Sequence, residues 1–476
     1  MYKMAVSQPV ELSEAGKEIK SLVDRARAAQ KQIENYSQEQ VDQLLRAMVW
    51  SVARPGVAEA IAKQAVEETA LGNYEGKFTK MSKKCRAALF DIIDDVSVGV
   101  IEELPERNII KVAKPIGVVG ALTPCTNPEA TPVIKAMNAL KGRNAIVIAP
   151  HPRAKITTKM LCDKMRAALK ACGAPEDLVI AIEQPSLDGT AELMKQCDVV
   201  LATGGGAMVK AAYSSGTPAL GVGAGNACIT VDETADLDDA ARKIKLSKTF
   251  DYATSCSSDN NVIAVAAIHD ALLEKLQAEG GYLVTEAEYP KFKDALWPDG
   301  SHLNPDIIAQ SAQRIAEVAG VSIPEDKSFI IVPENGAGPE HMFSGEKLSV
   351  VMGFHKVADV DEAVALTNAI QEYQGLGHSC GLYTTNDKAI EKFAMGTKTS
   401  RVMINQPQSL SNSANVWNGM RQTFSLGCGF WGGNSVNDNI NWRHLVNISW
   451  VSRPLDKVKV IPSDEDLFGD AMDLIK

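Results

Sequence analysis

Cys256 has the sequence surroundings of a reactive cysteine. It lies in the small, polar segment 254–261, and the apolar run that follows, residues 262–266, has the character of a buried strand. Counting alone favours burial, because most of the nine cysteines should be small core residues. A thiol among small polar residues at the mouth of a strand is, however, open to a substrate. We therefore predict that Cys256 is a nucleophile that forms a covalent intermediate.

Asn127 is the second candidate for chemistry, and it lies near another cysteine, Cys125. A side-chain amide at the end of a strand can donate to an oxyanion, although asparagine before Pro128 is also a common turn residue. Cys125 lacks the small polar neighbours that surround Cys256, so we rank it second as a nucleophile. The expected catalytic pair is therefore Cys256 with Asn127.

The first half of the chain contains the elements that must position these residues. Residues 12–103 are predicted to be helical, and residues 108–112 to form an exposed strand. Apolar strands then alternate with helices; the strands are 116–123, 144–150, 178–182 and 198–203, and the helices 132–142, 155–172 and 189–195. This order predicts a parallel sheet with right-handed crossovers, as in a Rossmann-type nucleotide-binding domain.

Ligands of such sheets bind at the carboxyl ends of the strands, which gives a first set of cofactor residues. The glycines 204–206 do not complete a GxGxxG pattern and can also form a simple tight turn, but a helix after them would offer free N–H groups to a phosphate. Arg153 can pair with a phosphate or be a solvated surface residue. The candidates from these strand ends are Thr123, Pro124, His151, Pro152, Arg153, Thr203, Gly204 and Gly205.

A second α/β pattern begins near residue 226. Its predicted strands are 261–266, 329–332, 348–354, 379–384 and 402–404. Residues 446–451 alternate as an edge strand would, which suggests a subunit contact. The glycine- and aromatic-rich residues 425–435 indicate close backbone approach to a ligand or to a neighbouring segment. We predict a nucleotide-binding domain (1–103 and 116–225), a catalytic domain (226–447), and an oligomerisation element with a tail (104–115 and 448–476).

The composition excludes several classes of protein. The chain has 476 residues and a net charge of −10, which disfavours nucleic acid and anionic membranes as partners. It has no apolar run long enough for a transmembrane helix, and residues 1–5 do not begin a signal peptide. The nine cysteines include no CxxC pair, so neither a metal site nor a disulfide framework is expected. We predict a cytoplasmic protein without a metal.

Taken together, these motifs resemble the aldehyde dehydrogenase superfamily, and specifically its coenzyme A-acylating branch. The resemblance extends from about residue 15 to about residue 455, and it is strongest in residues 123–128, 151–155, 202–205, 221–226, 255–258 and 426–435. The aldehyde half of the bifunctional aldehyde-alcohol dehydrogenases has close counterparts of these motifs. The implied fold is aldehyde dehydrogenase-like, with a Rossmann-type domain, a second α/β catalytic domain and a small oligomerisation element.

The resemblance also implies a mechanism and its ligands. The Cys256 thiolate attacks an aldehyde, while Asn127 and the Cys256 backbone N–H stabilise the oxyanion. Hydride passes to NAD or NADP, and coenzyme A then removes the acyl group from the cysteine. Gly223 would contact the cofactor, and Glu346, otherwise read as a surface glutamate, would bind the nicotinamide ribose. The implied partners are an aldehyde and coenzyme A, in a homo-oligomer that is a dimer or a tetramer.

Val222 separates the acylating from the hydrolytic branch. Hydrolytic members carry a water-activating glutamate in a Glu-Leu-Gly-Gly segment, and aligning Ala224 and Gly225 with those glycines places Val222 at the glutamate position. Valine cannot accept a proton, so a thiol acceptor is expected to compete with water.

The substrate is expected to be a short anionic aldehyde. Residues 405–422 are rich in hydrogen-bond donors and resemble those of acylating sulfoacetaldehyde dehydrogenases. We place Arg421, with a surface or structural role as the alternative, together with Asn418 and His378 near the substrate; His378 can also be an acid/base group or a core histidine. Sulfoacetaldehyde ranks first, before acetaldehyde or succinate semialdehyde. The rival functions are a hydrolytic aldehyde dehydrogenase and an inactive nucleotide-binding structural protein.

Overall fold

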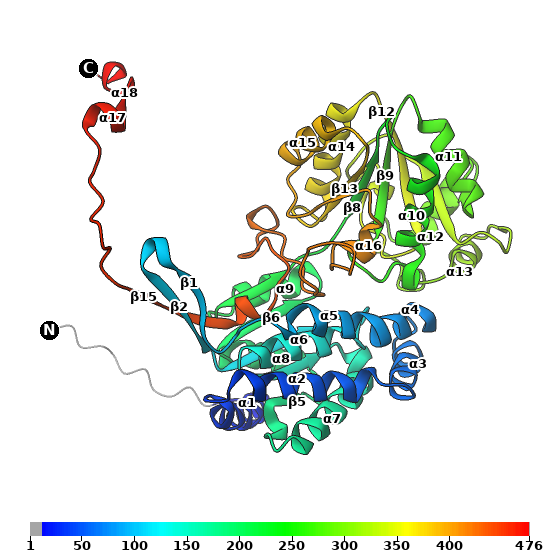
Figure 1. The fold of residues 1–476 in the computed structure, drawn as a ribbon. Helices are drawn as coiled ribbons and strands as arrows, with labels where there is room; N and C mark the ends of the chain where they lie inside the picture. The colour runs from blue at the N-terminus through cyan, green and yellow to red at the C-terminus, as the bar shows by residue number, and fades with distance from the viewer. Residues whose placement is uncertain (1–11, 476) are drawn as a thin grey trace.

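The computed structural model describes residues 12–475 and has two α/β lobes with a projecting arm (Figure 1). The expectation about a signal peptide concerns residues outside this range. One lobe contains the N-terminal helices and a five-stranded sheet, and the other contains a seven-stranded sheet. None of the helices in the described part of the chain combines the length and the apolar character needed to cross a bilayer.

The five-stranded sheet confirms the predicted parallel, Rossmann-type arrangement. Its strands lie in the order β5-β4-β3-β6-β7, and all neighbours are parallel. Their carboxyl ends therefore meet at one edge, with Thr123 opposite Pro150 and Thr203 opposite Val222. The strands are β3 (Val118–Thr123), β4 (Ala145–Pro150), β5 (Val179–Ala181), β6 (Val199–Thr203) and the unforeseen β7 (Ala219–Val222). The connecting helices are α6 (Thr131–Lys141), α7 (Lys155–Ala171), α8 (Leu187–Gln196) and α9 (Gly206–Tyr213).

The N-terminal helices pack on this sheet and its helices through one apolar core. Ser37 begins the second helix with a reciprocal capping box to Gln40, which explains where that helix starts. The helices are α1 (Glu14–Ile33), α2 (Gln38–Ala53), α3 (Val57–Thr69), α4 (Tyr74–Thr79) and α5 (Cys85–Ile93), with the π-helical segment η1 (Lys80–Lys84) between the last two. The prediction of helix up to residue 103 is wrong beyond Ile93. A strand, β1 (Gly99–Leu104), starts at a glycine with a φ of 76°, in the left-handed region that helices exclude.

The seven-stranded sheet is also parallel, in the order β10-β11-β12-β9-β8-β13-β14. Its strands are β8 (Ala227–Val231), β9 (Asp259–Val265), β10 (Gly281–Leu283), β11 (Phe329–Pro333), β12 (Val351–Val357), β13 (Cys380–Tyr383) and β14 (Val402–Ile404). Every predicted strand of this region is present, and β8 and β10 are additional. The helices α10 (Leu237–Thr249), α11 (His269–Ala278), α12 (Tyr289–Leu296) and α13 (Ala312–Val318) share one core with the sheet. Separate apolar clusters hold α14 (Val360–Tyr373) and α15 (Asp387–Gly396) against it.

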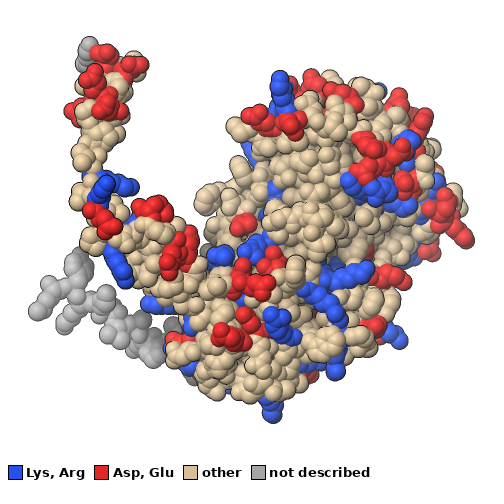
Figure 2. Space-filling model, viewed as in Figure 1, with Lys and Arg blue, Asp and Glu red and all other residues tan. Residues whose placement is uncertain are grey.

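The projecting arm is a three-stranded antiparallel sheet. It consists of β1, β2 (Ile109–Pro115) and β15 (Val446–Ser452), in that order, so β15 is an edge strand as its alternation predicted. Trp450 on that strand is 56% exposed. The tail beyond it carries α17 (Asp464–Phe468) and α18 (Ala471–Leu474), and acidic side chains gather on it (Figure 2). The suggested subunit contact stays a prediction.

Candidate active site

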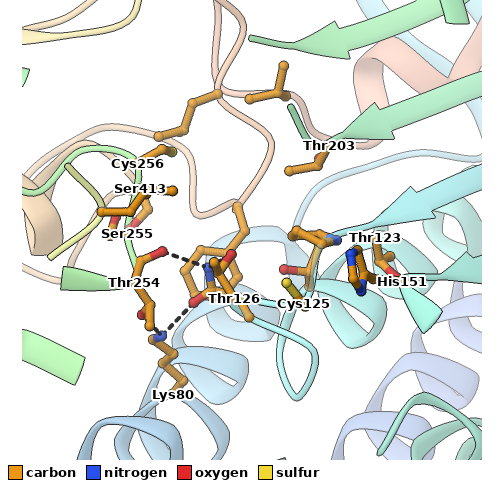
Figure 3. Close-up of a pocket in the computed structure, with 18 of the residues that line it drawn as sticks. Lys80, Thr123, Cys125, Thr126, His151, Thr203, Thr254, Ser255, Cys256 and Ser413 are labelled. Atoms are coloured by element: carbon orange, nitrogen blue, oxygen red, sulfur yellow. Dashed lines mark hydrogen bonds between the residues drawn. The ribbon is translucent and has the colours of Figure 1, made fainter. Parts of the chain in front are cut away.

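A cavity of about 870 Å³ opens at the carboxyl edge of the five-stranded sheet and reaches Cys256 in the other lobe. Figure 3 shows Thr123 and His151 at one end of it, and Ser255, Cys256 and Ser413 at the other. The structure thus brings most of the predicted site residues together around one space: Thr123, Pro124, Asn127, His151, Pro152, Thr203, Gly204, Gly205, Gly223, Cys256 and Glu346.

The end near Thr123 fits a dinucleotide. Gly205 is the N-cap residue of α9 and has no capping side chain, so the first N–H groups of this helix are free for a phosphate. A Cβ added at Gly205 or Gly206 would meet nothing within 4 Å, which leaves room for a ligand against the backbone. The buried Thr123 Oγ1 has no hydrogen-bond partner among the described residues. These features suit the predicted NAD or NADP.

Arg153 does not take part in this end of the cavity. It is absent from the lining, and its guanidinium donates to the backbone carbonyl of Thr69. The placement of Arg153 among the phosphate ligands is therefore not supported by the structure. The carbonyl that holds it comes from α3, far away in the sequence, which is why the strand-end pattern could not reveal it.

Cys256 lies between the turn η5 (Phe250–Ala253) and β9, and its side chain is half-buried. The Nε2 atom of His378 is 3.1 Å from its Sγ atom. Gly225 packs on the backbone of the cysteine, since a Cβ there would come within 2.0 Å of the Cys256 carbonyl oxygen. A base and a close-packed glycine therefore fix the position of the thiol.

The thiol and the imidazole are both neutral at pH 7 in this structure. Burial raises the pKa of Cys256 to about 12, the Glu346 carboxylate adds to this, and the Arg401 guanidinium acts against it. Burial, with the same arginine, lowers the pKa of His378 to about 3. An unprotonated His378 Nε2 can then accept a hydrogen bond from the thiol, while its Nδ1 is 2.9 Å from Ser379 Oγ. Because His378 is fully buried and outside the cavity lining, it is placed to act on Cys256 and not to bind substrate.

Asn127 is held by a lysine that the sequence did not single out. Lys80 Nζ lies 2.5 Å from Asn127 Oδ1 and 3.0 Å from Thr254 Oγ1. The other end of the amide, Nδ2, donates to the Thr254 carbonyl at 3.3 Å, two residues before the cysteine. Both ends of the Asn127 side chain are thus fixed, and the residue lines the cavity.

A buried charge network supports Lys80. Asp251 accepts from Lys80 and lies 3.0 Å from Lys77 Nζ, and these three side chains are almost inaccessible to solvent. The two ammonium groups hold the pKa of Asp251 below its usual value, against the effect of burial. Asp251 has a φ of 49°, and a Cβ at Gly76 would come within 2.4 Å of its side chain. Such strain in a non-glycine residue persists only where its surroundings enforce it.

Three lysines line the cavity beside Asn127: Lys80, Lys83 and Lys84. Together with Lys77 they are spaced at positions i, i+3, i+6 and i+7, which approximates one face of a helix. That spacing was a visible signal in the sequence, and sequence reasoning missed it because it treated the segment only as helix.

Arg421 and Asn418 are not placed to bind a substrate in the cavity. Arg421 donates to the Asp91 carbonyl at 2.7 Å and pairs with Asp95 at 3.1 Å, so its charge is already matched. The Nδ2 atom of Asn418 donates to Gln406 Oε1 and to the Ser411 carbonyl, at 3.0 Å each. Neither lines the cavity, and we correct both assignments.

The glycine-rich residues 425–435 approach a neighbouring segment. A Cβ at Gly377 would lie 2.0 Å from the Cys428 carbonyl oxygen, and one at Gly432 would lie 2.5 Å from the Cys428 side chain. The Asn434 side chain accepts from the Cys428 N–H at 2.9 Å, which closes the loop on itself. The loop is therefore fastened next to His378 by backbone packing.

Val222 ends β7 and lines the cavity, with only 2% of its surface exposed.

Glu346 is the sole carboxylate among the described residues that line the cavity, and burial raises its pKa to about 8. Within residues 12–475, no group of three or more His, Cys, Asp or Glu side chains is arranged to hold a metal ion.

Comparison with known proteins gives consistent matches. The sequence pattern of the aldehyde dehydrogenase family matches residues 8–291. The chain is 45% identical to a sulfoacetaldehyde dehydrogenase of Acholeplasma sp, over 96% of this chain and 95% of that protein. It is 42% identical to the succinate-semialdehyde dehydrogenase (acetylating) of Clostridium kluyveri, over 95% of this chain and 99% of that one.

Two crystal structures share the fold. An acetylating aldehyde dehydrogenase from Geobacillus thermoglucosidasius superposes with a TM-score of 0.89 at 36% identity, over 94% of this chain and 99% of that chain. The propionaldehyde dehydrogenase of Rhodopseudomonas palustris, with bound coenzyme A and an acylated cysteine, superposes with a TM-score of 0.82 at 27% identity, over 91% and 97%. The predicted fold is thereby confirmed over almost the whole chain.

Proposed function

The chain belongs to the aldehyde dehydrogenase family, and we propose that it oxidises a short anionic aldehyde to an acyl-coenzyme A thioester through Cys256. The observation that carries the proposal is the position of Cys256. Its thiol has a neutral imidazole at 3.1 Å and lines the same cavity as the glycines at the start of α9. Relatives named as acetylating enzymes align with this chain over almost its whole length.

The residues divide the chemistry as follows. His378 accepts the thiol proton, and the Cys256 sulfur adds to the aldehyde carbon. Asn127 and the Cys256 N–H stabilise the resulting oxyanion. The nicotinamide, when bound, supplies the acceptor for the hydride that leaves this carbon, and a thioester remains on Cys256. The thiol of coenzyme A then attacks the thioester carbonyl, and the Cys256 thiolate departs and regains its proton.

Coenzyme A is the proposed acceptor because the cavity lacks a base for water at the position of Val222. Glu346 is the carboxylate that remains, and we assign it to the cofactor ribose. In this proposal the lobe with the five-stranded sheet binds NAD or NADP, the lobe with the seven-stranded sheet carries the nucleophile, and the three-stranded arm joins subunits into a dimer or tetramer.

The proposed substrate carries a sulfonate, with a carboxylate as the second choice. Relatives named for sulfoacetaldehyde and for succinate semialdehyde are 45% and 42% identical to this chain. Both aldehydes are short and anionic, and the cavity is lined by three lysines and one carboxylate. A site with this balance of charge suits an anion better than an uncharged alkyl chain.

The test is to measure NAD(P)H and acyl-coenzyme A formation from sulfoacetaldehyde, succinate semialdehyde and acetaldehyde, each with and without coenzyme A. We expect thioester product with coenzyme A, the highest kcat/KM for sulfoacetaldehyde, and no product from Cys256→Ala. Equal NAD(P)H formation without coenzyme A, with free acid as product, would refute the acylating assignment. Parallel assays with NAD and NADP identify the cofactor.

A further inference from the structure

Two of the lysines that line the cavity form no ion pair with a carboxylate of the described residues. The charge of Lys80 is matched by Asp251. For Lys83 and Lys84, in contrast, no carboxylate of residues 12–475 lies within ion-pair distance. Lys83 is exposed at the cavity, and Lys84 is partly buried in its wall. An unmatched ammonium in a partly desolvated wall gains most when an anion binds beside it.

Lys84 lies at the catalytic end of the cavity. Its Nζ atom donates to the Ser413 carbonyl at 3.0 Å and also to the Ala414 carbonyl. Ser413 is drawn at the same end as Cys256, away from Thr123 (Figure 3). An ammonium has three donors, and these contacts use two, so one donor remains for a ligand. Burial lowers the pKa of Lys84 to about 7, and the charge of Asp91, which forms its ion pair with Arg421, acts against this without closing an ion pair to Lys84.

The local backbone brings these lysines to the cavity wall. Residues 80–84 form a π-helix, a rare element that is frequent at functional sites. Ser409, Ser413 and Asn415 line the same cavity and add neutral hydrogen-bonding groups, and they belong to the donor-rich segment noted in the sequence. Cations and neutral donors around one space are what a sulfonate or carboxylate requires.

We propose that Lys84, with Lys83, binds the anionic group of the aldehyde and sets the preference for anionic substrates. This inference rests on the proposed function and replaces Arg421, whose charge is matched by Asp91 and Asp95. Coenzyme A also carries anionic groups, but its phosphates are far from its reacting thiol. A cation at the Cys256 end therefore suits the anion of a short aldehyde, and the KM for coenzyme A distinguishes the two sources.

The experiment compares the full-length enzyme with Lys84→Met, Lys84→Arg and Lys83→Met. Lys388→Met, which changes an exposed lysine on α15, is the matched control. For each variant, kcat/KM is measured with sulfoacetaldehyde, succinate semialdehyde, acetaldehyde and propionaldehyde at saturating coenzyme A, and KM for coenzyme A is measured separately. Thermal unfolding shows whether each variant is folded.

We expect Lys84→Met to lower the ratio of kcat/KM for anionic over neutral aldehydes by about 10- to 100-fold, mainly through KM. Lys83→Met should lower it less, Lys84→Arg should retain most of it, and Lys388→Met should not change it. An equal loss on neutral and anionic aldehydes, or a change confined to the KM for coenzyme A, would overturn the inference. After either result, acyl-coenzyme A formation by the wild-type enzyme would still uphold the proposed function. A wild-type enzyme that forms no acyl-coenzyme A would refute both the proposed function and this inference.

Discussion

Replacing Lys80 by methionine tests whether a buried charge network orients the catalytic amide. Methionine fills similar space but removes the ammonium that contacts Asn127 Oδ1 at 2.5 Å and Thr254 Oγ1 at 3.0 Å. The substitution also leaves Asp251 with one ammonium in place of two. Two effects follow, one on stability and one on turnover.

The expected loss of stability is about 3 kcal/mol. Breaking a buried ion pair costs about 3–5 kcal/mol, because a buried charge is left without its partner. Here Asp251 keeps Lys77 at 3.0 Å, the Thr254 hydroxyl at 2.7 Å and the Asn73 N–H at 2.8 Å, which favours the lower value. For turnover, loss of an oxyanion donor costs about 10²- to 10³-fold in kcat. Asn127 would be misplaced and not removed, so we expect about a 10²-fold fall in kcat with little change in KM.

Denaturant unfolding gives the first quantity, and kcat at saturating aldehyde and coenzyme A gives the second. Lys77→Met is the matched control, since Lys77 contacts Asp251 and the Thr126 carbonyl but not Asn127. It should lose comparable stability with a much smaller fall in kcat. A folded Lys80→Met enzyme with kcat within about twofold of wild type, or an equal fall in Lys77→Met, would refute the orienting role.

Three further predictions concern the groups around the thiol. Gly225→Ala should lower kcat by about 10²-fold, because its Cβ would lie 2.0 Å from the Cys256 carbonyl oxygen. Gly205→Ala, whose Cβ would lie in open space, should keep the thiol reactive. Equal rates of Cys256 alkylation in the wild type and in both variants would contradict this. The pKa of about 12 means that alkylation of Cys256 in the free enzyme, followed by mass spectrometry of its peptide, should rise about tenfold per pH unit between about pH 7 and pH 9; a plateau in that range would show a lower pKa. Glu346→Gln should raise the KM for the dinucleotide without changing the ratio of acyl-coenzyme A to free acid; a change in that ratio would make Glu346 a base.

Most of the buried strands were predictable because their physical signal is local, although the fully buried β8 was not foreseen. Strands such as β3 and β4 are buried on every residue, so each reads as an uninterrupted apolar run. β1 was missed because it is exposed and carries two glutamates, and β10 because it begins with a glycine and only that residue is buried. Pairing with β2 and β11, which the sequence of either strand does not encode by itself, makes them strands.

The candidate site was predictable where it depends on strand ends and not where it depends on distant partners. Parallel strands bring their carboxyl ends together, so Thr123, His151 and Thr203 could be grouped in advance. Lys80 meets Asp251 across 171 residues, and Arg421 meets Asp91 across 330. A sequence shows the donor in each pair but not which acceptor uses it, and this is why Arg421 was misplaced.

The central claim, that the acyl group on Cys256 leaves to a thiol, can be tested by trapping the intermediate. The enzyme is mixed with one equivalent of aldehyde and NAD(P) without coenzyme A, and the mass of the Cys256 peptide is measured before and after coenzyme A is added. The account predicts an acyl group on Cys256 that persists without coenzyme A and is then recovered as an equal amount of acyl-coenzyme A. Release of free acid before coenzyme A is added, or an acyl group on another residue such as Cys125, would contradict it.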